Sequence, residues 1–368
     1  MGWRRSLSGV LAVLVLCASA PSVAVSAQAL PRLQSVGPPG GVGCAMCDDA
    51  TAFGRIQGIA LLSDGTTVVV DRDEPMVRLL DPDGGVVAAW GRTGDGPGEL
   101  RMPLDVAVTS RDGILVADAM KTRLVAFDRN GTPSRDVPLT QTAMDVRGSP
   151  EGGWIALQEA RWATMSGAVI LLDDQPRQHS TPLGDTRDGL TDGNGDGATA
   201  GTFSSAPGPD GRVAVSLGDE YRVRVLNPDG TPLHEIRRDI ARVRRTAEEV
   251  AAIREDRERA RRTRGGGHPE SAGAEVEVDP LHPHLFSRDA LSYDGEGRLW
   301  VRTPRGGPTK TIFDLFDSTG AFLGEVVADR ALTDFFLGKE TLVGVTEDRD
   351  TGIQRVMRWR LVDGTSGR

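Results

Sequence analysis

The 368-residue chain has few histidines and cysteines, two residue types on which catalytic and metal sites often depend. Its five histidines are scattered along the sequence: His179, His234, His268, His282 and His284. No Gly-x-Ser-x-Gly nucleophile elbow occurs in the chain. Beyond residue 27, no apolar run is long enough to cross a membrane. The sequence therefore lacks an enzyme signature, and we expect no transmembrane helix in the mature chain.

Cysteine is also scarce, with three residues in all. Cys17 lies in an N-terminal apolar stretch, whereas Cys44 and Cys47 form a Cys-Ala-Met-Cys motif. Haem attachment would need histidine where Asp48 stands, a zinc site would need two more ligands nearby, and a redox role would need a β-α-β setting. In an oxidising compartment, a local disulfide between Cys44 and Cys47 is the remaining interpretation.

The chain also lacks an excess of positive charge, since its formal net charge is −9 at pH 7. Arg4 and Arg5, the apolar run 7–20 and the small residues at 25–27 have the order of a secretory signal, with cleavage before Gln28. Removing residues 1–27 takes away two arginines and no acid, which brings the mature chain to −11. We therefore expect an exported protein, periplasmic or extracellular, that does not bind nucleic acid.

What the chain does contain is a repeated hairpin unit. Residues 101–131 show it best, as short β-rich runs joined by Asp-Gly and Asn-Gly turns. The tight turn recurs in six copies, at 64–65, 112–113, 151–153, 210–211, 296–297 and 338–339. Four strands per unit and a period of about 40–50 residues are typical of a β-propeller. We predict an all-β fold: a six-bladed β-propeller of four-stranded antiparallel blades, forming one domain over residues 28–368.

The last blade poses a problem of closure. Its run 354–362 reads as a third strand, and no fourth strand follows it. An unpaired strand edge invites aggregation. The only free candidate is the run 32–36, so we predict that it pairs beside residues 354–362 as the outer strand of the last blade.

One insertion, at about residues 239–284, separates blades 4 and 5. Thr246 and Glu249 have the spacing of a capping box and predict one α-helix there. Residues 237–264 hold eleven arginines against six acids. Such a helix could be a basic lid or a contact for an anionic surface, or it could be a solvated, salt-bridged helix beside the ring.

Residues 88–128 resemble an NHL repeat. The run 91–100, Gly-Arg-Thr-Gly-Asp-Gly-Pro-Gly-Glu-Leu, is followed by Pro103 and by Asp105-Val-Ala-Val, as in that family. The other blades match only in skeleton. The resemblance implies an exported bacterial six-bladed propeller, and proteins of this architecture include binding scaffolds, gluconolactonase-like hydrolases and amidating lyases. The fold therefore does not fix the function.

In a propeller blade, the turns between strands one and two and between strands three and four lie on one face. The remaining turns and the links between blades lie on the other. The long links 91–102, 184–201 and 239–284 all belong to this second face, here called the loop-rich face. Long loops on one end of a rigid scaffold are where binding usually occurs.

Carboxylates gather on the same face. Four aspartates occupy matching places at the start of the innermost strand: Asp105, Asp145, Asp289 and Asp334. Asp71 and Asp118 begin turns on this face. Converging carboxylates would attract a cation or a polyhydroxyl ligand at the channel mouth, and crowding would raise some of their pKa values. Alternatively, each aspartate only accepts hydrogen bonds from nearby backbone N–H groups.

A second candidate metal site lies in the link 184–201. Asp192, Asn194 and Asp196 have the spacing D-x-N-x-D-G of a calcium loop. The match is incomplete, because Ala200 and Phe203 stand where further ligands belong. A flexible Gly/Asp loop explains the same residues, so calcium is a hypothesis here.

Two functions follow. The first is an exported, non-catalytic scaffold, expected to be a monomer, that binds a ligand or protein partner on its loop-rich face. The second is a metal-dependent lactone hydrolase or lyase of the gluconolactonase-like or amidating-lyase-like type, using a divalent ion held by the channel-mouth carboxylates. That enzyme would need three or four ligands at one point, and the sequence supplies no matching Asn or His there.

Overall fold

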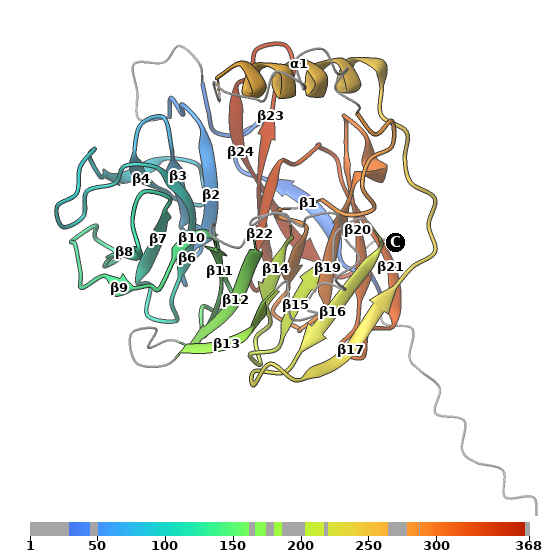
Figure 1. Cartoon of the computed structure of the whole chain (residues 1–368), viewed down its shortest axis with the longest axis horizontal. Helices are drawn as coiled ribbons and strands as arrows, with labels where there is room; N and C mark the ends of the chain where they lie inside the picture. Colours follow the sequence, from blue (N-terminus) through green and yellow to red (C-terminus); the bar gives the residue numbers. More distant parts are fainter. Residues whose placement is uncertain are drawn as a thin grey trace, which may run out of the picture.

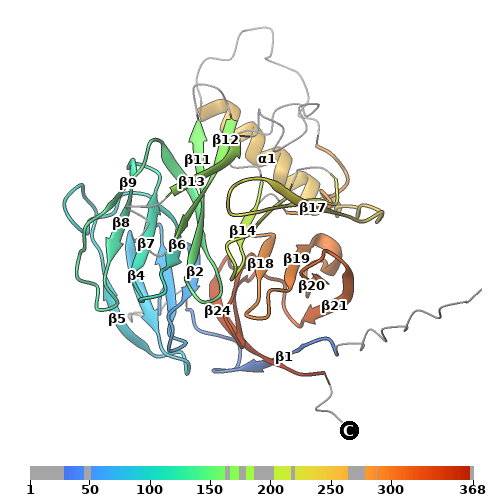
Figure 2. The ribbon, with the colours of Figure 1, turned by 90° about the horizontal axis from the view of Figure 1, so that it is seen from below.

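A computed structural model describes residues 29–44, 51–161, 166–173, 180–185, 203–216, 220–263, 278–286 and 288–364. Six four-stranded antiparallel sheets form a ring, which confirms the predicted propeller (Figures 1 and 2). The innermost strand of each blade contacts that of the next, and β22 contacts β2, so the ring is closed.

The first three blades follow one another along the chain. Blade 1 comprises β2 (Ile56–Leu61), β3 (Thr67–Asp71), β4 (Met76–Leu80) and β5 (Val86–Trp90). Blade 2 comprises β6 (Pro103–Val108), β7 (Ile114–Asp118), β8 (Arg123–Phe127) and β9 (Val137–Pro138). Blade 3 comprises β10 (Thr142–Gly148), β11 (Trp154–Arg161), β12 (Ser166–Asp173) and β13 (Ser180–Asp185).

The second half of the ring has the same order. Blade 4 comprises β14 (Ser205–Pro207), β15 (Val213–Ser216), β16 (Arg222–Leu226) and β17 (Pro232–Arg237). Blade 5 comprises β18 (Leu291–Tyr293), β19 (Leu299–Thr303), β20 (Thr311–Phe316) and β21 (Phe322–Ala328), with a 3-10 turn at Pro304–Gly306. Blade 6 comprises β22 (Asp334–Leu337), β23 (Thr341–Glu347), β24 (Gln354–Val362) and β1 (Arg32–Val36).

Short apolar strands and Asp/Gly turns explain why these sheets form. The inner strands β3, β6 and β7 are buried along their whole length, as expected for strands packed between neighbouring blades. The turn after β8 shows the local chemistry: the Asp128 carboxylate accepts the N–H groups of Asn130 and Thr132 at 2.9 and 2.8 Å. Gly131 has φ +82°, and a Cβ there would lie 2.4 Å from the Trp90 ring, so this turn requires glycine.

The predicted exchange of the outer strand is confirmed. β1 pairs antiparallel with β24, in a register from Arg32 opposite Val362 to Val36 opposite Arg358. Leu30 and Leu33 pack against the apolar cluster that contains Trp359. The N-terminal segment thus supplies the strand that blade 6 lacks.

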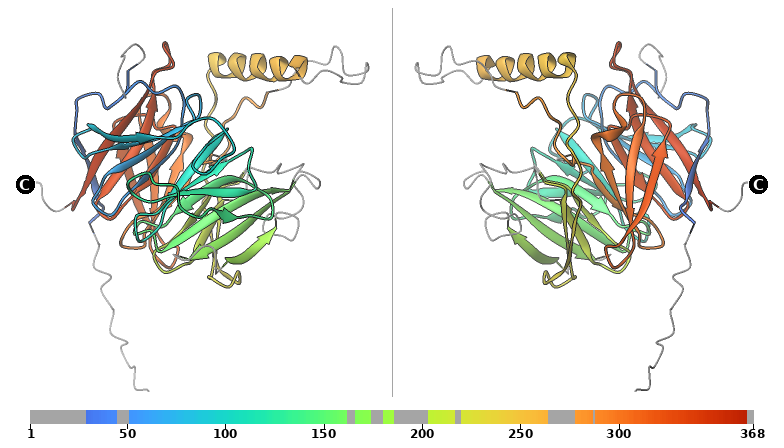
Figure 3. Two further views of the ribbon diagram at one scale, coloured as in Figure 1. Left: turned by 90° about the vertical axis from the view of Figure 1, so that its left-hand side faces the viewer. Right: turned by 90° about the vertical axis from the view of Figure 1, so that its right-hand side faces the viewer.

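The single predicted helix is α1 (Ala247–Thr263), in the insertion between β17 and β18. Its capping box is present, because the Glu249 carboxylate accepts the Thr246 N–H at 2.8 Å and the Thr246 hydroxyl accepts the Glu249 N–H at 3.1 Å. Figure 3 shows α1 beyond the blades, on one side of the ring. It touches blade 6 through Glu249 and Arg349, whose charged atoms are 3.5 Å apart.

The expected signal segment 1–27 lies outside the described residues, so its cleavage stays a prediction. Among the residues that the structure does describe, no helix is long and apolar enough to cross a membrane.

Candidate functional site

The four channel aspartates lie together, and they surround an arginine. Asp105 is on β6, Asp145 on β10 and Asp334 on β22, while Asp289 lies two residues before β18, the inner strand of blade 5. The Arg147 Nε lies 3.8 Å from Asp105 Oδ2 and 3.9 Å from Asp145 Oδ1. Its Nη2 donates to Asp334 Oδ1 at 2.6 Å and also to Asp289 Oδ1. The Arg147 guanidinium therefore contacts carboxylates from four blades.

Arg147 reaches across the channel. It starts on blade 3, and its Nη1 donates to the Phe335 carbonyl oxygen of blade 6 at 2.9 Å. Blades 3 and 6 stand opposite one another in a six-bladed ring. The Arg147 side chain is only 5% exposed. It thus crosses the channel at the height of the four aspartates.

Two more arginines line this cluster. The Arg302 Nη2 donates to the Arg288 carbonyl oxygen at 3.2 Å, and its guanidinium lies 4.3 Å from the centre of the Phe286 ring. The Arg288 Nη2 donates to the Met144 carbonyl oxygen at 3.5 Å. Together with Arg147 they set three guanidinium groups against four carboxyl groups. The cluster therefore has one formal negative charge in excess when every group is ionised.

Burial and neighbouring charges shift the pKa values of the aspartates in different directions. Burial raises the pKa of Asp334 to about 6, against the opposing effect of Arg147. Burial also raises the pKa of Asp105 well above its usual value, with Asp145 adding to the effect and Arg147 opposing it. For Asp289, burial would raise the pKa, but the surrounding Arg147, Arg288 and Arg302 outweigh it and lower the pKa. A carboxyl that holds its proton removes the excess charge of the cluster.

Blade 1 has glycine at the matching place because of its neighbour. A Cβ on Gly58 would lie 2.5 Å from Asp105 Oδ1 and 2.7 Å from the Asp105 Cα. The Asp105 carboxylate itself accepts the Val106 N–H at 2.8 Å and the Val146 N–H at 3.1 Å. Gly58 thus makes room for a carboxylate that joins blades 2 and 3 and lies against blade 1.

Arg147 was not among the sequence-predicted site residues, although a signal was present. Arg147 stands two residues after Asp145, so both side chains point to the same side of β10. The residues two places after Gly58, Asp105 and Asp334 are Ala60, Ala107 and Phe336. A lone arginine in an apolar series was the sign that this position faces the aspartates.

Asp71 and Asp118 accept hydrogen bonds from the links that enter blades 1 and 2. The Asp71 carboxylate accepts the N–H groups of Gly54 and Arg55 at 2.8 and 3.0 Å, and the Arg78 Nη1 donates to it at 3.1 Å. The Asp118 carboxylate accepts the Arg101 N–H at 2.6 Å, and the neighbouring Met102 N–H at 3.1 Å. Both carboxylates are fully buried. They therefore hold the links that enter blades 1 and 2, and their part in ligand binding stays a prediction.

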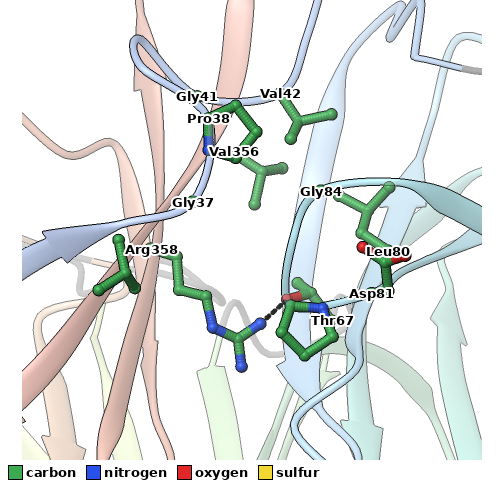
Figure 4. Close-up of a pocket in the computed structure, with 12 residues that line it drawn as sticks. Gly37, Pro38, Gly41, Val42, Thr67, Leu80, Asp81, Gly84, Val356 and Arg358 are labelled. Carbon is green, nitrogen blue, oxygen red and sulfur yellow. Dashed lines mark hydrogen bonds between the residues drawn. The ribbon is translucent and has the colours of Figure 1, made fainter.

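A cavity lies where the rim of the ring closes, between β1 and blade 1 (Figure 4). Its space for water is only about 20 Å³, which is room for roughly one molecule. Arg358 donates to the Gly65 carbonyl oxygen at 2.6 Å and points toward Thr67. This cavity belongs to the seam of the ring and is too small for an organic ligand.

The other predicted site residues are described only in part. Asp192, Asn194 and Asp196 lie outside the described residues, so the calcium hypothesis stays a prediction. Cys44 is disulfide-bonded, while its expected partner Cys47 also lies outside. In the segments that the structure describes, no three His, Cys, Asp or Glu side chains are arranged to hold a metal ion.

No protein-family model matches the chain, and no curated protein matches its sequence. A solved structure of a protein of unknown function from Bacteroides thetaiotaomicron has a TM-score of 0.50 and 13% identity, over 90% of this chain and 76% of that one. A Bacteroides fragilis protein, named as exported, has a TM-score of 0.50 and 9% identity, over 91% of this chain and 96% of that one. A gluconolactonase from Xanthomonas campestris has a TM-score of 0.49 and 13% identity, over 92% and 93%. At such identities the likeness is one of fold alone.

Proposed function

We propose that this chain is an exported propeller, similar to NHL-repeat proteins, that binds a ligand or a protein partner on its loop-rich face and is not catalytic. The observation that carries the proposal is the pairing of the channel aspartates with Arg147. Because this pairing uses the carboxylates internally, the long links are the part of the face that remains to contact a partner. Export is supported by the signal-like segment 1–27.

The NHL-like link 91–102 is suited to binding because its own contacts hold it in one shape. Glu99 accepts the Gly96 N–H at 2.8 Å, and the Arg92 Nε donates to it at 2.6 Å. The Lys121 Nζ donates to the Glu99 carbonyl oxygen at 2.5 Å. A loop that is already ordered loses little conformational entropy on binding. The NHL-like residues thus favour a preorganised surface.

The insertion is held to the ring at its base. Arg238 forms an ion pair with the buried Asp314 of blade 5 at 2.7 Å. Arg242 forms an ion pair with Asp279 at 2.6 Å, which joins the two arms of the insertion. Beyond this base, Ala251 is among the exposed residues of α1. The helix is therefore presented to solvent from a fixed position, which supports a contact role for this face.

The metal-dependent hydrolase or lyase is less well supported. Its divalent ion would need several channel carboxylates as ligands, but a guanidinium already lies among them. The residues present therefore do not fit a metal ion at this position, and we derive no metal-assisted step. Saturable hydrolysis of a lactone panel that is abolished in D289N would overturn the non-catalytic proposal.

Site-specific photo-crosslinking tests which face binds. A photoreactive residue is placed at Met120, in the turn after β7 on the loop-rich face and 58% exposed, and in a second variant at Ala251 of α1. The matched control carries it at Glu151, which is 59% exposed on the opposite face. With the exported protein fraction of the native host, we expect the same discrete crosslinked product from positions 120 and 251. A product from position 151 alone, or equal products from all three, would overturn the proposal.

A further inference from the structure

The central cluster consists of four aspartates around the Arg147 guanidinium, which occupies the place where a metal-binding site would hold its ion. Asp289 and Asp334 share the Nη2 of Arg147, while Asp105 and Asp145 lie within 3.9 Å of its Nε. The aspartates come from four blades, so no local turn explains their convergence. What they have in common is the guanidinium between them.

Physical chemistry explains why such a cation is needed. Carboxylates that are removed from water without a counter-charge are strongly destabilising. Asp105, Asp145 and Asp334 are all at least 94% buried, since their exposed fractions are 1%, 3% and 6%. A guanidinium provides five N–H donors in one plane and keeps its charge at any physiological pH. Arg147 can therefore offset part of the negative charge of this cluster and hydrogen-bond within it.

Arg147 and a metal ion would compete for the same oxygens. The Nη2 lies between Asp289 and Asp334, where an ion bridging the two would have to be. Two other buried carboxylate oxygens, Asp145 Oδ1 and Asp334 Oδ2, accept no hydrogen bond from the described residues. Those oxygens would become ligands if a smaller cation took the place of the guanidinium.

We propose that Arg147 is the built-in cation of this channel, which takes the place of a divalent metal ion and keeps the wild-type channel free of one. The inference is independent of the proposed function, since it holds whether or not the loop-rich face binds a partner. It makes Arg147 a positioning residue that joins blades 3, 5 and 6. It also predicts that a metal site is latent in the carboxylates and appears when Arg147 is removed.

The test measures the response to manganese and calcium chloride. All proteins carry D192N and D196N, so that the separate candidate loop cannot contribute. In this background, we expect Tm to change by less than about 1 °C with either salt or with a chelator. R147M, which keeps much of the side-chain volume but has no charge, should be less stable. A hundredfold excess of ion over Kd should then raise its Tm by roughly 4 °C.

Two further variants decide between outcomes. R147M combined with D289N should lose the manganese response, because a ligand is missing. R147K keeps a positive charge and should resemble the wild type in showing no metal response. It is measured in place of R147M if R147M does not fold. A metal response in folded R147K would overturn the proposal. The proposal also fails if the wild-type channel binds one manganese ion in a way that D289N abolishes, or if folded R147M shows no response.

Discussion

The ring is closed twice, at its rim and at its centre, by different kinds of interaction. At the rim, β1 adds a strand to β24 over five residue pairs, from Arg32 opposite Val362 to Val36 opposite Arg358. At the centre, the single side chain of Arg147 connects blade 3 with blades 5 and 6. The rim closure consists of repeated backbone pairing, whereas the central closure depends on one guanidinium placed among four carboxyl groups.

This difference determines how each closure should fail. A β-ladder distributes its stability over many bonds, each worth about 1 kcal/mol net, so single substitutions weaken it gradually. A buried ion pair leaves uncompensated charges when one partner is removed, so one substitution has a large effect. The comparison therefore predicts a graded response at the rim and an abrupt one at the centre.

Removal of the rim strand should have the largest effect. Deleting residues 29–37 takes away the β1 ladder and the packing of Leu30 and Leu33 against the Trp359 cluster. We expect the free energy of unfolding to fall by roughly 4–6 kcal/mol, from the lost backbone bonds and the lost apolar burial. Urea denaturation monitored by tryptophan fluorescence measures it.

Two controls make this deletion specific. Gln34→Ala changes only an exposed side chain of β1 and should leave stability within about 0.5 kcal/mol of wild type. A synthetic peptide of residues 29–37 added to the shortened protein should restore part of the loss. If the shortened protein is as stable as the full chain, the rim closure is not what holds blade 6.

Loss of the central charge should come next. Arg147→Met leaves four carboxyl groups without their shared guanidinium, and we expect a loss of about 3–5 kcal/mol. Arg349→Met is the matched control, because Arg349 is 55% exposed and makes one surface ion pair. Its loss should be about 0–1 kcal/mol. Similar losses in the two variants would mean that Arg147 is not a central fastener.

The rim was predictable from sequence, and the centre only in part. The order of the strands follows from the hairpin turns. Because no strand follows Gln354–Val362 in the sequence, Arg32–Val36 was the remaining candidate for its outer partner. The positions of the aspartates followed from the repeat in the same way. The contacts of these aspartates depend on how far the Arg147 side chain extends across the channel. The pattern of strands in the sequence does not predict that distance. The capping roles of Asp71 and Asp118 likewise depend on how the links approach them.

The central cluster should also respond to pH. The pKa of Asp334 is raised to about 6 in the folded protein, above its ordinary value of 3.8, and that of Asp105 is raised too. The folded state therefore holds these protons more tightly than the unfolded state does. The contribution of Asp334 to stability is fully present below about pH 4 and is lost as the pH rises through about 6.

We expect the wild type to lose about 1–3 kcal/mol through this cluster between pH 5 and pH 8. D334N removes the titrating group, so the difference between wild type and D334N should follow that window. Asp289 acts in the opposite direction, because its lowered pKa contributes stability that is lost as the pH falls below about 4. Asp317→Asn, at an exposed turn with a lowered pKa, is the control and should leave the response between pH 5 and 8 unchanged. If D334N shows the same dependence of stability on pH as the wild type, Asp334 is not the source of that dependence.

The smallest expected effect is the coupling between the two closures, and it is the sharpest test of whether they are separate. Leu33→Ala weakens the rim and Arg147→Met weakens the centre, and the two residues share no partner among the contacts described. Effects of substitutions without shared partners usually add to within about 0.5 kcal/mol. A double-mutant cycle in urea should therefore give an interaction energy below that value. A larger energy would mean that opening the rim lets the centre relax. The blades would then be held as one cooperative ring, and the division into two independent closures would be wrong.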